Sequence, residues 1–195
     1  MKIGIIKEGK EPIDRRVPLI PEQCSELMEI YPQLSLVVQS SPIRCYDDQD
    51  YQNKGIEIVE DLSDCDLIMG VKEVPLKLLI PNKKYLFFSH TIKQQPYNKN
   101  LLKEILNKNI DLIDYEVLKD LNGDRIIGFG RYAGIVGAYN AFLTYGLKEK
   151  KYKLKPAYLC QDQKEMEEEL KKIKIDNLKI ILTGDGRVSK GVEEI

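Results

Sequence analysis

Basic and acidic side chains directly follow several short apolar runs of the sequence, and these side chains could do acid–base chemistry. They are Lys7-Glu8, Lys72-Glu73, Ser89-His90 and Glu116. In an open α/β sheet, ligands bind beyond the carboxyl ends of the strands, so we expect a lysine, a histidine and two carboxylates to meet at one edge. Cations near a lysine lower its proton affinity and carboxylates restore it, which suits proton exchange near neutral pH.

Each of these residues also has a simpler interpretation. An ordinary solvated lysine at a strand end accounts for Lys72, and a lone histidine such as His90 is more often structural than catalytic. Arg15 and Arg16 precede an apolar segment, where they are either solvated or able to hold a carboxylate by forked hydrogen bonds. Only the joint occurrence of these groups favours a functional site.

The elements that must position these residues alternate between short apolar strands and helical stretches, which is the pattern of an α/β fold. We expect strands near residues 3–6, 34–38, 67–71, 85–88, 112–115, 125–127 and 178–182. One helix should run from Pro21 to Ile30, and Asn98 can cap another. Asn122-Gly123 is typical of a hairpin turn. The sequence therefore predicts an open, mostly parallel sheet with flanking helices, Rossmann-like or flavodoxin-like.

The second half of the chain changes in composition. Small residues recur every three to four positions between Gly130 and Ala141, so a helix here can approach a neighbour closely. A charged stretch from Lys164 to Lys174 predicts a solvated helix with a stripe of apolar residues on its buried side. That stripe is formed by Met166, Leu170 and Ile173.

An apolar run over residues 179–183 leads into a glycine-rich turn and a helix-like end. The turn contains Gly184, Gly186, Arg187 and Gly191. Such a strand, turn and helix open a dinucleotide-binding unit, in which backbone N–H groups approach a pyrophosphate. The standard glycine spacing is not met, because Ser189 stands where the third glycine belongs. A turn and helix without a ligand is at least as consistent with this spacing.

Composition excludes several classes of protein. The 195 residues hold 30 Lys plus Arg against 31 Asp plus Glu, which argues against a nucleic-acid partner. The longest nearly apolar stretch, residues 132–143, is too short for a bilayer and the N-terminus has no signal-peptide pattern, so we expect no membrane partner and a cytoplasmic protein. Four widely spaced cysteines and one histidine predict reduced thiols and no metal site.

Several of these segments resemble a known family. Lys7-Glu8, residues 16–21, residues 70–75 and His90 are similar to the N-terminal domain shared by alanine dehydrogenase and pyridine-nucleotide transhydrogenase. Within that superfamily, residues 89–93, 114–116 and 128–134 look more like lysine-forming saccharopine dehydrogenase. The resemblance covers essentially the whole chain.

The resemblance implies an oxidoreductase that uses NAD to oxidise a C–N bond of an amino acid to an imine, which water then opens. Its partner would be a small amino-acid or keto-acid substrate. Carried over by position, Lys72 would be the base and His90 its acid–base partner, with Glu73 and Glu116 tuning their protons. Residues for the substrate carboxylates and the cleft would be Arg16, Lys93, Arg125 and Phe129. Residues for the NAD pyrophosphate would be Gly184, Gly186, Arg187 and Gly191.

The resemblance also implies a division of the chain. Residues 1–130 would form the substrate-binding and catalytic domain, and residues 131–195 a linking helix with the first strand and glycine loop of an incomplete NAD-binding domain. Family members continue well past this length, so we expect the chain alone to have little or no dehydrogenase activity. It would act as a homo-oligomer or with a complementing C-terminal part. Alanine dehydrogenase and a non-catalytic, transhydrogenase-like binding domain remain the alternative functions.

Overall fold

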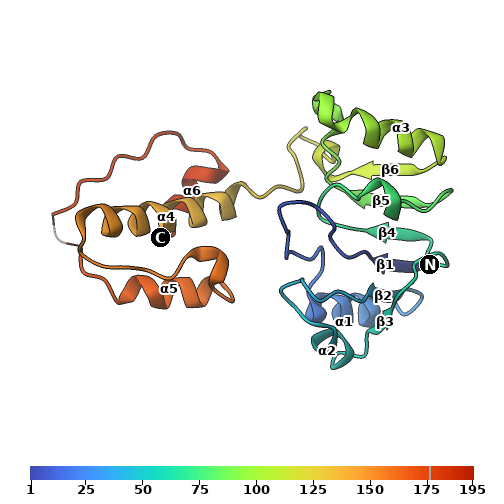
Figure 1. Ribbon diagram of the computed structural model, residues 1–195, viewed down its shortest axis with the longest axis horizontal. Helices are drawn as coiled ribbons and strands as arrows, with labels where there is room; N and C mark the ends of the chain where they lie inside the picture. Colours follow the sequence, from blue (N-terminus) through green and yellow to red (C-terminus); the bar gives the residue numbers. More distant parts are fainter. Residues whose placement is uncertain (176) are drawn as a thin grey trace. The chain divides into compact units, whose positions relative to one another are not determined.

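The computed structural model describes residues 1–175 and 177–195 and divides the chain into two compact units (Figure 1). The first unit comprises Met1–Ile127 and the second Gly128–Ile195. No helix in the described part of the chain is long and apolar enough to cross a membrane.

The first unit is built on a six-stranded sheet in which every neighbouring pair of strands is parallel. The strands are β1 (Lys2–Ile5), β2 (Ser35–Gln39), β3 (Glu57–Val59), β4 (Leu67–Met69), β5 (Lys84–Phe87) and β6 (Asp111–Asp114). Their order across the sheet is β3-β2-β1-β4-β5-β6, which is the Rossmann order rather than the flavodoxin order. The predicted open parallel sheet is confirmed.

Helices cover both faces of this sheet because its strands are apolar on both sides. The α-helices of the first unit are α1 (Pro21–Ile30), α2 (Asp48–Gln52) and α3 (Lys99–Asn107). Ile3 and Ile5 of β1 pack in one core cluster with residues of α1 and α2, whereas Ile6 belongs to a second cluster with residues of α3. This alternation follows from the two-residue period of a strand.

Two predicted features at the end of the first unit have different outcomes. The turn at Asn122-Gly123 is confirmed, since Gly123 has a φ of +85° and its N–H donates to the Asp120 carbonyl at 3.1 Å. The predicted strand at residues 125–127 is wrong, because only an isolated antiparallel bridge joins Arg125 to Lys119. A single bridge does not make a strand, and no named strand of the described residues pairs with residues 125–127.

Sequence reasoning also missed β3, which is three residues long and lies at the sheet edge.

The second unit is helical over its regular part. Its helices are α4 (Gly130–Glu149), α5 (Gln163–Lys171) and α6 (Arg187–Glu193). Glycines allow α4 and α6 to touch through their backbones: a Cβ atom on Gly134 would lie 2.0 Å from the Val188 carbonyl oxygen, and one on Gly191 would lie 1.9 Å from that of Arg131. The predicted close approach of a small-residue helix is therefore confirmed.

The charged helix of the second unit also behaves as its pattern predicts. Met166 of α5 is buried with Ile135, Tyr139 and Leu154, and Leu170 and Ile173 pack against this cluster. The opposite, charged side of α5 carries ion pairs such as Lys171 with Glu168 at 2.6 Å.

The predicted strand at residues 178–182 is wrong. In the part of the chain that the structure describes, no strand pairs with this segment, and three of its four apolar side chains, Ile180, Ile181 and Leu182, are exposed, with Ile181 at 79%. A β-strand needs a neighbouring strand for its N–H and C=O groups, and the described remainder of the second unit is helical or irregular. Local β-propensity alone does not form the element.

The glycine contact predicts opposite effects of the same substitution at two positions of α4. Gly134→Ala should destabilise the α4–α6 pairing by about 1–3 kcal/mol, because the new methyl group overlaps the Val188 carbonyl. Gly137→Ala should stabilise α4 by about 0.5–1 kcal/mol, since a Cβ at Gly137 meets no atom of the described residues within 4 Å. Hydrogen exchange of the α4 amides measures both changes; equal protection in the two variants would contradict the contact.

Candidate functional site

The loops that carry the candidate residues leave the carboxyl ends of adjacent strands. From β1 the chain winds outward through β2 to β3, and from β4 it winds the other way through β5 to β6. The strand order therefore reverses between the paired strands β1 and β4, and open α/β sheets bind ligands beyond the strand ends at such a point. Glu8 follows β1, Lys72 follows β4 and His90 follows β5, so the topology brings these residues to one edge.

Lys72 and His90 lie in contact. The Nζ atom of Lys72 is 3.5 Å from Nε2 of His90, so the juxtaposition that the sequence predicts is confirmed. His90 has a φ of +55° at the start of a short 3₁₀ helix, η2 (Thr91–Lys93). This left-handed conformation is uncommon for a residue with a side chain and is found where the surroundings impose it.

Glu73 and Lys10 extend this contact into a chain of four polar side chains. Oε1 of Glu73 lies 2.5 Å from Nδ1 of His90, and Oε2 accepts a hydrogen bond from Lys10 Nζ at 2.7 Å. A carboxylate beside Nδ1 favours the tautomer with its proton on that nitrogen, which leaves Nε2 facing the amine of Lys72. Sequence reasoning missed Lys10, whose only signal was its place in the loop after β1.

The surroundings shift the proton affinities of this chain. Burial lowers the pKa of Lys72 below that of a free lysine, and the positive charge of Arg16 lowers it further. Burial alone would raise the pKa of Glu73, but hydrogen bonds from Lys10 and His90 outweigh burial and hold that pKa below its usual value. The neutral form of Lys72 is thereby made more accessible, while Glu73 stays ionised.

Glu8 holds the backbone at Lys72. Its two carboxylate oxygens accept hydrogen bonds from the N–H groups of Val71 at 2.6 Å and Lys72 at 3.1 Å. Burial raises the pKa of Glu8, and the two backbone bonds oppose that rise. A Cβ at Gly70 would lie 3.0 Å from Ile6 Cγ2, which is closer than an ordinary contact, and at normal contact distance from Glu8 Oε1. Glu8 thus links the end of β1 to the end of β4.

Arg16 already binds a carboxylate within the chain. Its Nε and Nη2 atoms donate to the two oxygens of Asp14 at 2.9 and 2.5 Å, in the forked arrangement expected for an arginine. Burial acts to raise the pKa of Asp14, but these hydrogen bonds hold it below the usual value. Arg15 instead donates from Nε to the Ile43 carbonyl at 3.3 Å. A substrate carboxylate at Arg16 would have to share its guanidinium with Asp14.

The carboxylate of Glu116, just after β6, lies close to two cationic side chains. Its Oε1 atom lies 3.1 Å from Lys93 Nζ and 3.6 Å from Arg125 Nη1, and both cations keep close to half of their side-chain surface exposed. Its buried Oε2 atom has no hydrogen-bond partner among residues 1–175 and 177–195. The pair of exposed cations can receive an anion, and Glu116 fixes their positions.

A buried hydrogen bond that sequence reasoning missed joins the ends of β5 and β6. Ser89 donates to Asp114, and Asp114 in turn accepts from the N–H of Glu116 at 2.8 Å. Both side chains are buried, so this pair sets the loop with His90 against the loop with Glu116.

The remaining predicted site residues belong to the second unit. Phe129 precedes the first residue of α4, and Gly186 precedes the first residue of α6. Gly184 has a φ of +88°, which a glycine adopts without strain. Gly191 is buried against Arg131, so the α4–α6 contact requires a glycine there independently of any cofactor. No group of three or more His, Cys, Asp or Glu side chains able to hold a metal ion occurs among the described residues.

The electrostatics of the site predict how Lys72 responds to its neighbours. Arg16→Gln should raise the pKa of Lys72, because it removes a nearby positive charge and leaves Asp14 unneutralised. A pH titration of the lysine side chain by NMR measures this pKa. The matched control is Arg15→Gln, which removes a neighbouring guanidinium that contacts the Ile43 carbonyl instead. If both variants move the pKa of Lys72 equally, Arg16 does not act on it directly.

The sequence of this chain matches a known protein family. The model of the alanine dehydrogenase/PNT N-terminal domain matches residues 4–136. The alpha-aminoadipic semialdehyde synthase of Arabidopsis thaliana is 39% identical over 153 residues, covering 76% of this chain and 14% of that protein. A saccharopine dehydrogenase [NAD(+), L-lysine-forming] of Yarrowia lipolytica is 30% identical over 154 residues, covering 76% of this chain and 41% of that protein.

Solved structures agree on the fold. An L-alanine dehydrogenase superposes with a TM-score of 0.61 at 20% identity, covering 79% of this chain and 44% of that one. A transhydrogenase from Sinorhizobium meliloti superposes with a TM-score of 0.57 at 14% identity, covering 73% of this chain and 44% of that one. The chain spans less than half the length of these relatives. By its sequence match over residues 4–136, the chain belongs to the alanine dehydrogenase/PNT N-terminal domain family.

Proposed function

We propose that this chain supplies the substrate-binding and acid–base groups of an NAD-dependent amino-acid dehydrogenase of the saccharopine dehydrogenase type. The observation that carries the proposal is the 3.5 Å contact between Lys72 Nζ and His90 Nε2. Glu73 and Lys10 continue this contact as a hydrogen-bonded chain. Such a hydrogen-bonded series of side chains can exchange protons with a substrate without leaving an unpaired charge.

Lys72 is the group that first acts on the substrate. Its lowered pKa makes the neutral amine accessible, and this amine takes a proton from the substrate ammonium. The lone pair freed on the substrate nitrogen then forms the C=N bond as the adjacent carbon loses hydride. Bound NAD would supply the acceptor for that hydride.

His90 and Lys72 then handle the protons of hydrolysis. Water adds to the imine carbon, one of the two bases takes its proton, and the substrate nitrogen receives a proton before it leaves as an amine. Glu73 keeps the His90 ring oriented and its Nδ1 protonated, so Nε2 remains the exchanging atom.

Exposed cations in the site suit a substrate that carries several carboxylates. Lys93 and Arg125 keep close to half of their side-chain surface exposed, which supports both as carboxylate contacts. A carboxylate at Arg16 would share its guanidinium with Asp14. Saccharopine-type substrates have such carboxylates, whereas alanine has one. This difference favours the saccharopine-type reaction over the deamination of alanine.

Gly184, Gly186 and Arg187 are the residues proposed to meet the NAD pyrophosphate. A Cβ on Gly186 would meet no atom of the described residues within 4 Å, so the backbone here can approach a phosphate. A dinucleotide site is built on a parallel sheet, and residues 178–182 have no paired strand in the described second unit. The turn at residues 184–187 would therefore form only part of the NAD site. We infer that a complementing C-terminal part completes it and that the active protein is cytoplasmic.

The substrate proposal is tested by binding of a dicarboxylate to the chain itself. 2-Oxoglutarate should bind more tightly than pyruvate and shift the NMR signals of His90, Lys93 and Glu116. Lys93→Gln should weaken 2-oxoglutarate binding by about tenfold, since a charge-assisted contact is lost. Lys103→Gln, which removes an exposed lysine of α3, is the control. Equal binding of pyruvate and 2-oxoglutarate would remove the preference for several carboxylates.

The catalytic proposal is tested in an active, longer version in which the Yarrowia lipolytica relative supplies the sequence beyond the aligned segment. Lys72→Met should lower turnover of lysine, 2-oxoglutarate and NADH by about 100-fold or more, as loss of a general base does. Lys77→Met, at an exposed lysine of the 3₁₀ helix η1 (Leu76–Leu78), should leave turnover unchanged. A loss below about tenfold for Lys72→Met would exclude it from the mechanism. The 195-residue chain alone should produce no appreciable NADH from saccharopine or alanine.

A further inference from the structure

Phe88, the first residue after β5, carries an aromatic ring to which the proposed mechanism gives no role. The residue is buried, with 3% of its surface exposed. Its N–H donates to the Val71 carbonyl at 3.1 Å, and its ring packs against the buried Tyr115 ring with 5.1 Å between the ring centres. Phe88 is therefore fixed both to the residue before Lys72 and to the residue after β6.

The amine of Lys72 lies over the face of this ring. Its Nζ atom is 5.4 Å from the centre of the Phe88 ring. An ammonium within about 6 Å of a ring centre is attracted by the negative charge of the ring face. This attraction favours the charged form of Lys72, whereas burial and the Arg16 charge favour the neutral form. The ring therefore opposes those two effects and holds the amine when it carries a proton.

The imidazole of His90 stacks on the Phe88 ring as well. The two ring centres are 6.2 Å apart and the ring planes form an angle of 25°, which is an offset-stacked arrangement. Ser89, which lies between them in the sequence, donates to Asp114 instead. One buried ring thus contacts both groups of the 3.5 Å pair formed by Lys72 and His90.

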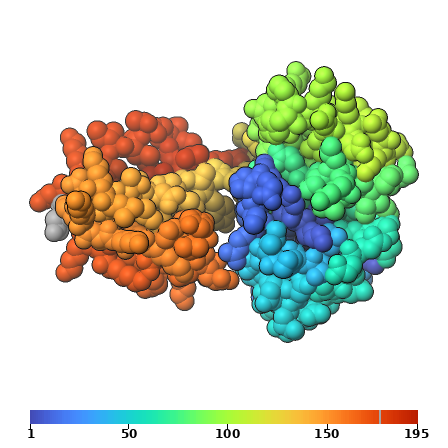
Figure 2. Space-filling view, viewed as in Figure 1, coloured from blue at the N-terminus to red at the C-terminus, as the bar shows by residue number. Residues whose placement is uncertain are grey.

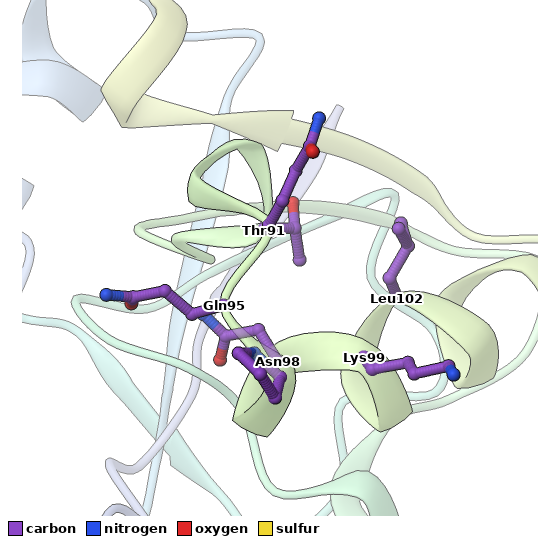
Figure 3. A pocket seen from close by; sticks show the side chains of 7 residues that line it. Thr91, Gln95, Asn98, Lys99 and Leu102 are labelled. Atoms are coloured by element: carbon purple, nitrogen blue, oxygen red, sulfur yellow. The ribbon is translucent and has the colours of Figure 1, made fainter.

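The segment that follows His90 packs loosely on its other side. A cavity of about 390 Å³ lies between η2 and the first turn of α3. Figure 3 shows Thr91 and Leu102 on opposite sides of this hollow. The position of the His90 side chain is therefore set by its own contacts, with Glu73 and with the Phe88 ring.

We propose that Phe88 is a positioning residue of the candidate site, whose ring holds the Lys72 amine and the His90 imidazole beside each other. The inference rests on the proposed function, in which these two groups exchange protons with the substrate. An apolar ring suits this task because it has no proton of its own to exchange. It holds both groups and takes no part in the transfer.

Charged groups from several segments also act on Lys72, and a substitution at Phe88 leaves all of these charges unchanged. They are Glu8, Lys10, Asp14 and Arg16 from the segment after β1, Glu73 from its own loop, and His90. Figure 2 shows the N-terminal segment in blue on the visible face of the first unit. A change in the pKa of Lys72 on substitution of Phe88 therefore reports on the ring.

The experiment is a pH titration of the 195-residue chain, followed by NMR of the Lys72 side chain and the His90 ring. Phe88→Leu should lower the proton affinity of Lys72 by about threefold, because the aromatic face is lost. Water that enters the vacated space would act in the opposite direction and raise the pKa. The sign of the change therefore separates a ring that holds the amine from a ring that only fills space.

The matched control is Phe87→Leu, the same substitution at the preceding residue. Phe87 is fully buried and packs in the core cluster with Tyr85, edge to face at 6.1 Å. Phe87→Leu should lower the stability of the first unit and leave the pKa of Lys72 unchanged. If Phe88→Leu does not fold, Phe88→Met, which is closer in volume and also lacks the ring, takes its place with Phe87→Met as its control.

Kinetics in the longer, active version give a second readout. Phe88→Leu should lower turnover of saccharopine by about tenfold, because the two groups are less well placed. It should also move the acid limb of the pH–rate profile to lower pH, since the base with the lowered pKa stays neutral there. Phe88→Tyr keeps the ring face and should show neither change.

Three results would overturn the proposal: a pKa of Lys72 that rises or stays the same in Phe88→Leu, an equal fall in Phe87→Leu, or a pH–rate profile in Phe88→Tyr that moves as far as in Phe88→Leu. Failure of the proposed function is recognised separately, since it appears as unchanged turnover in Lys72→Met. The NMR titration of the 195-residue chain does not depend on turnover, so it still decides whether the ring holds the amine.

Discussion

The contact between the Lys72 amine and the His90 imidazole is the interaction that the surrounding residues of the first unit hold in place. Two basic groups in contact resist being positively charged together, so their arrangement is stable only if one of them gives up its proton easily or a carboxylate lies close by. Both conditions are present: burial and the Arg16 charge lower the pKa of Lys72, and Glu73 binds the far side of the His90 ring. Lys10 then neutralises Glu73 on its other oxygen. The result is a set of alternating charges in which a proton can move without leaving an isolated ion.

The parallel sheet makes this contact possible because it places loops from different parts of the chain at one edge. Lys72 and His90 are carried by consecutive strands, and Glu8 comes from β1, on the other side of the point where the strand order reverses. Glu8 bonds to two successive backbone N–H groups, at Val71 and Lys72, so it holds the loop rather than the reacting amine. The Ser89 and Asp114 pair fixes the adjacent loops in the same manner. The carboxylates of Glu8 and Asp114 therefore hold the loops that carry the two reacting side chains.

The sequence could predict the elements and the edge, but only part of the site. Strand residues such as Ile3 and Ile5 repeat every second position, and this local pattern specifies the sheet and the ends of its strands. Lys10 and the clamp formed by Glu8 could not be predicted, since they depend on the path of the loop after β1. Residues 178–182 have the composition of a strand, yet a strand also requires a partner, which is a non-local condition. Asn98 has the residue type of a helix cap, but the preceding 3₁₀ turn gives it helical dihedral angles and directs its amide elsewhere.

The glycines of the second unit show why a motif needs its structural context. In the sequence, Gly191 is the next glycine after Gly186, two positions beyond Ser189, which stands where a phosphate-binding turn has its last glycine. In the structure it faces the Arg131 carbonyl across the α4–α6 contact, as Gly134 faces Val188 from the other helix, and a methyl group at either position would overlap the opposing backbone. Packing alone therefore explains a glycine at 191, whereas no such contact explains Gly186 in the described part of this unit. The proposal for a pyrophosphate thus rests on Gly186 and on the left-handed turn at Gly184, and Gly191 adds nothing to it.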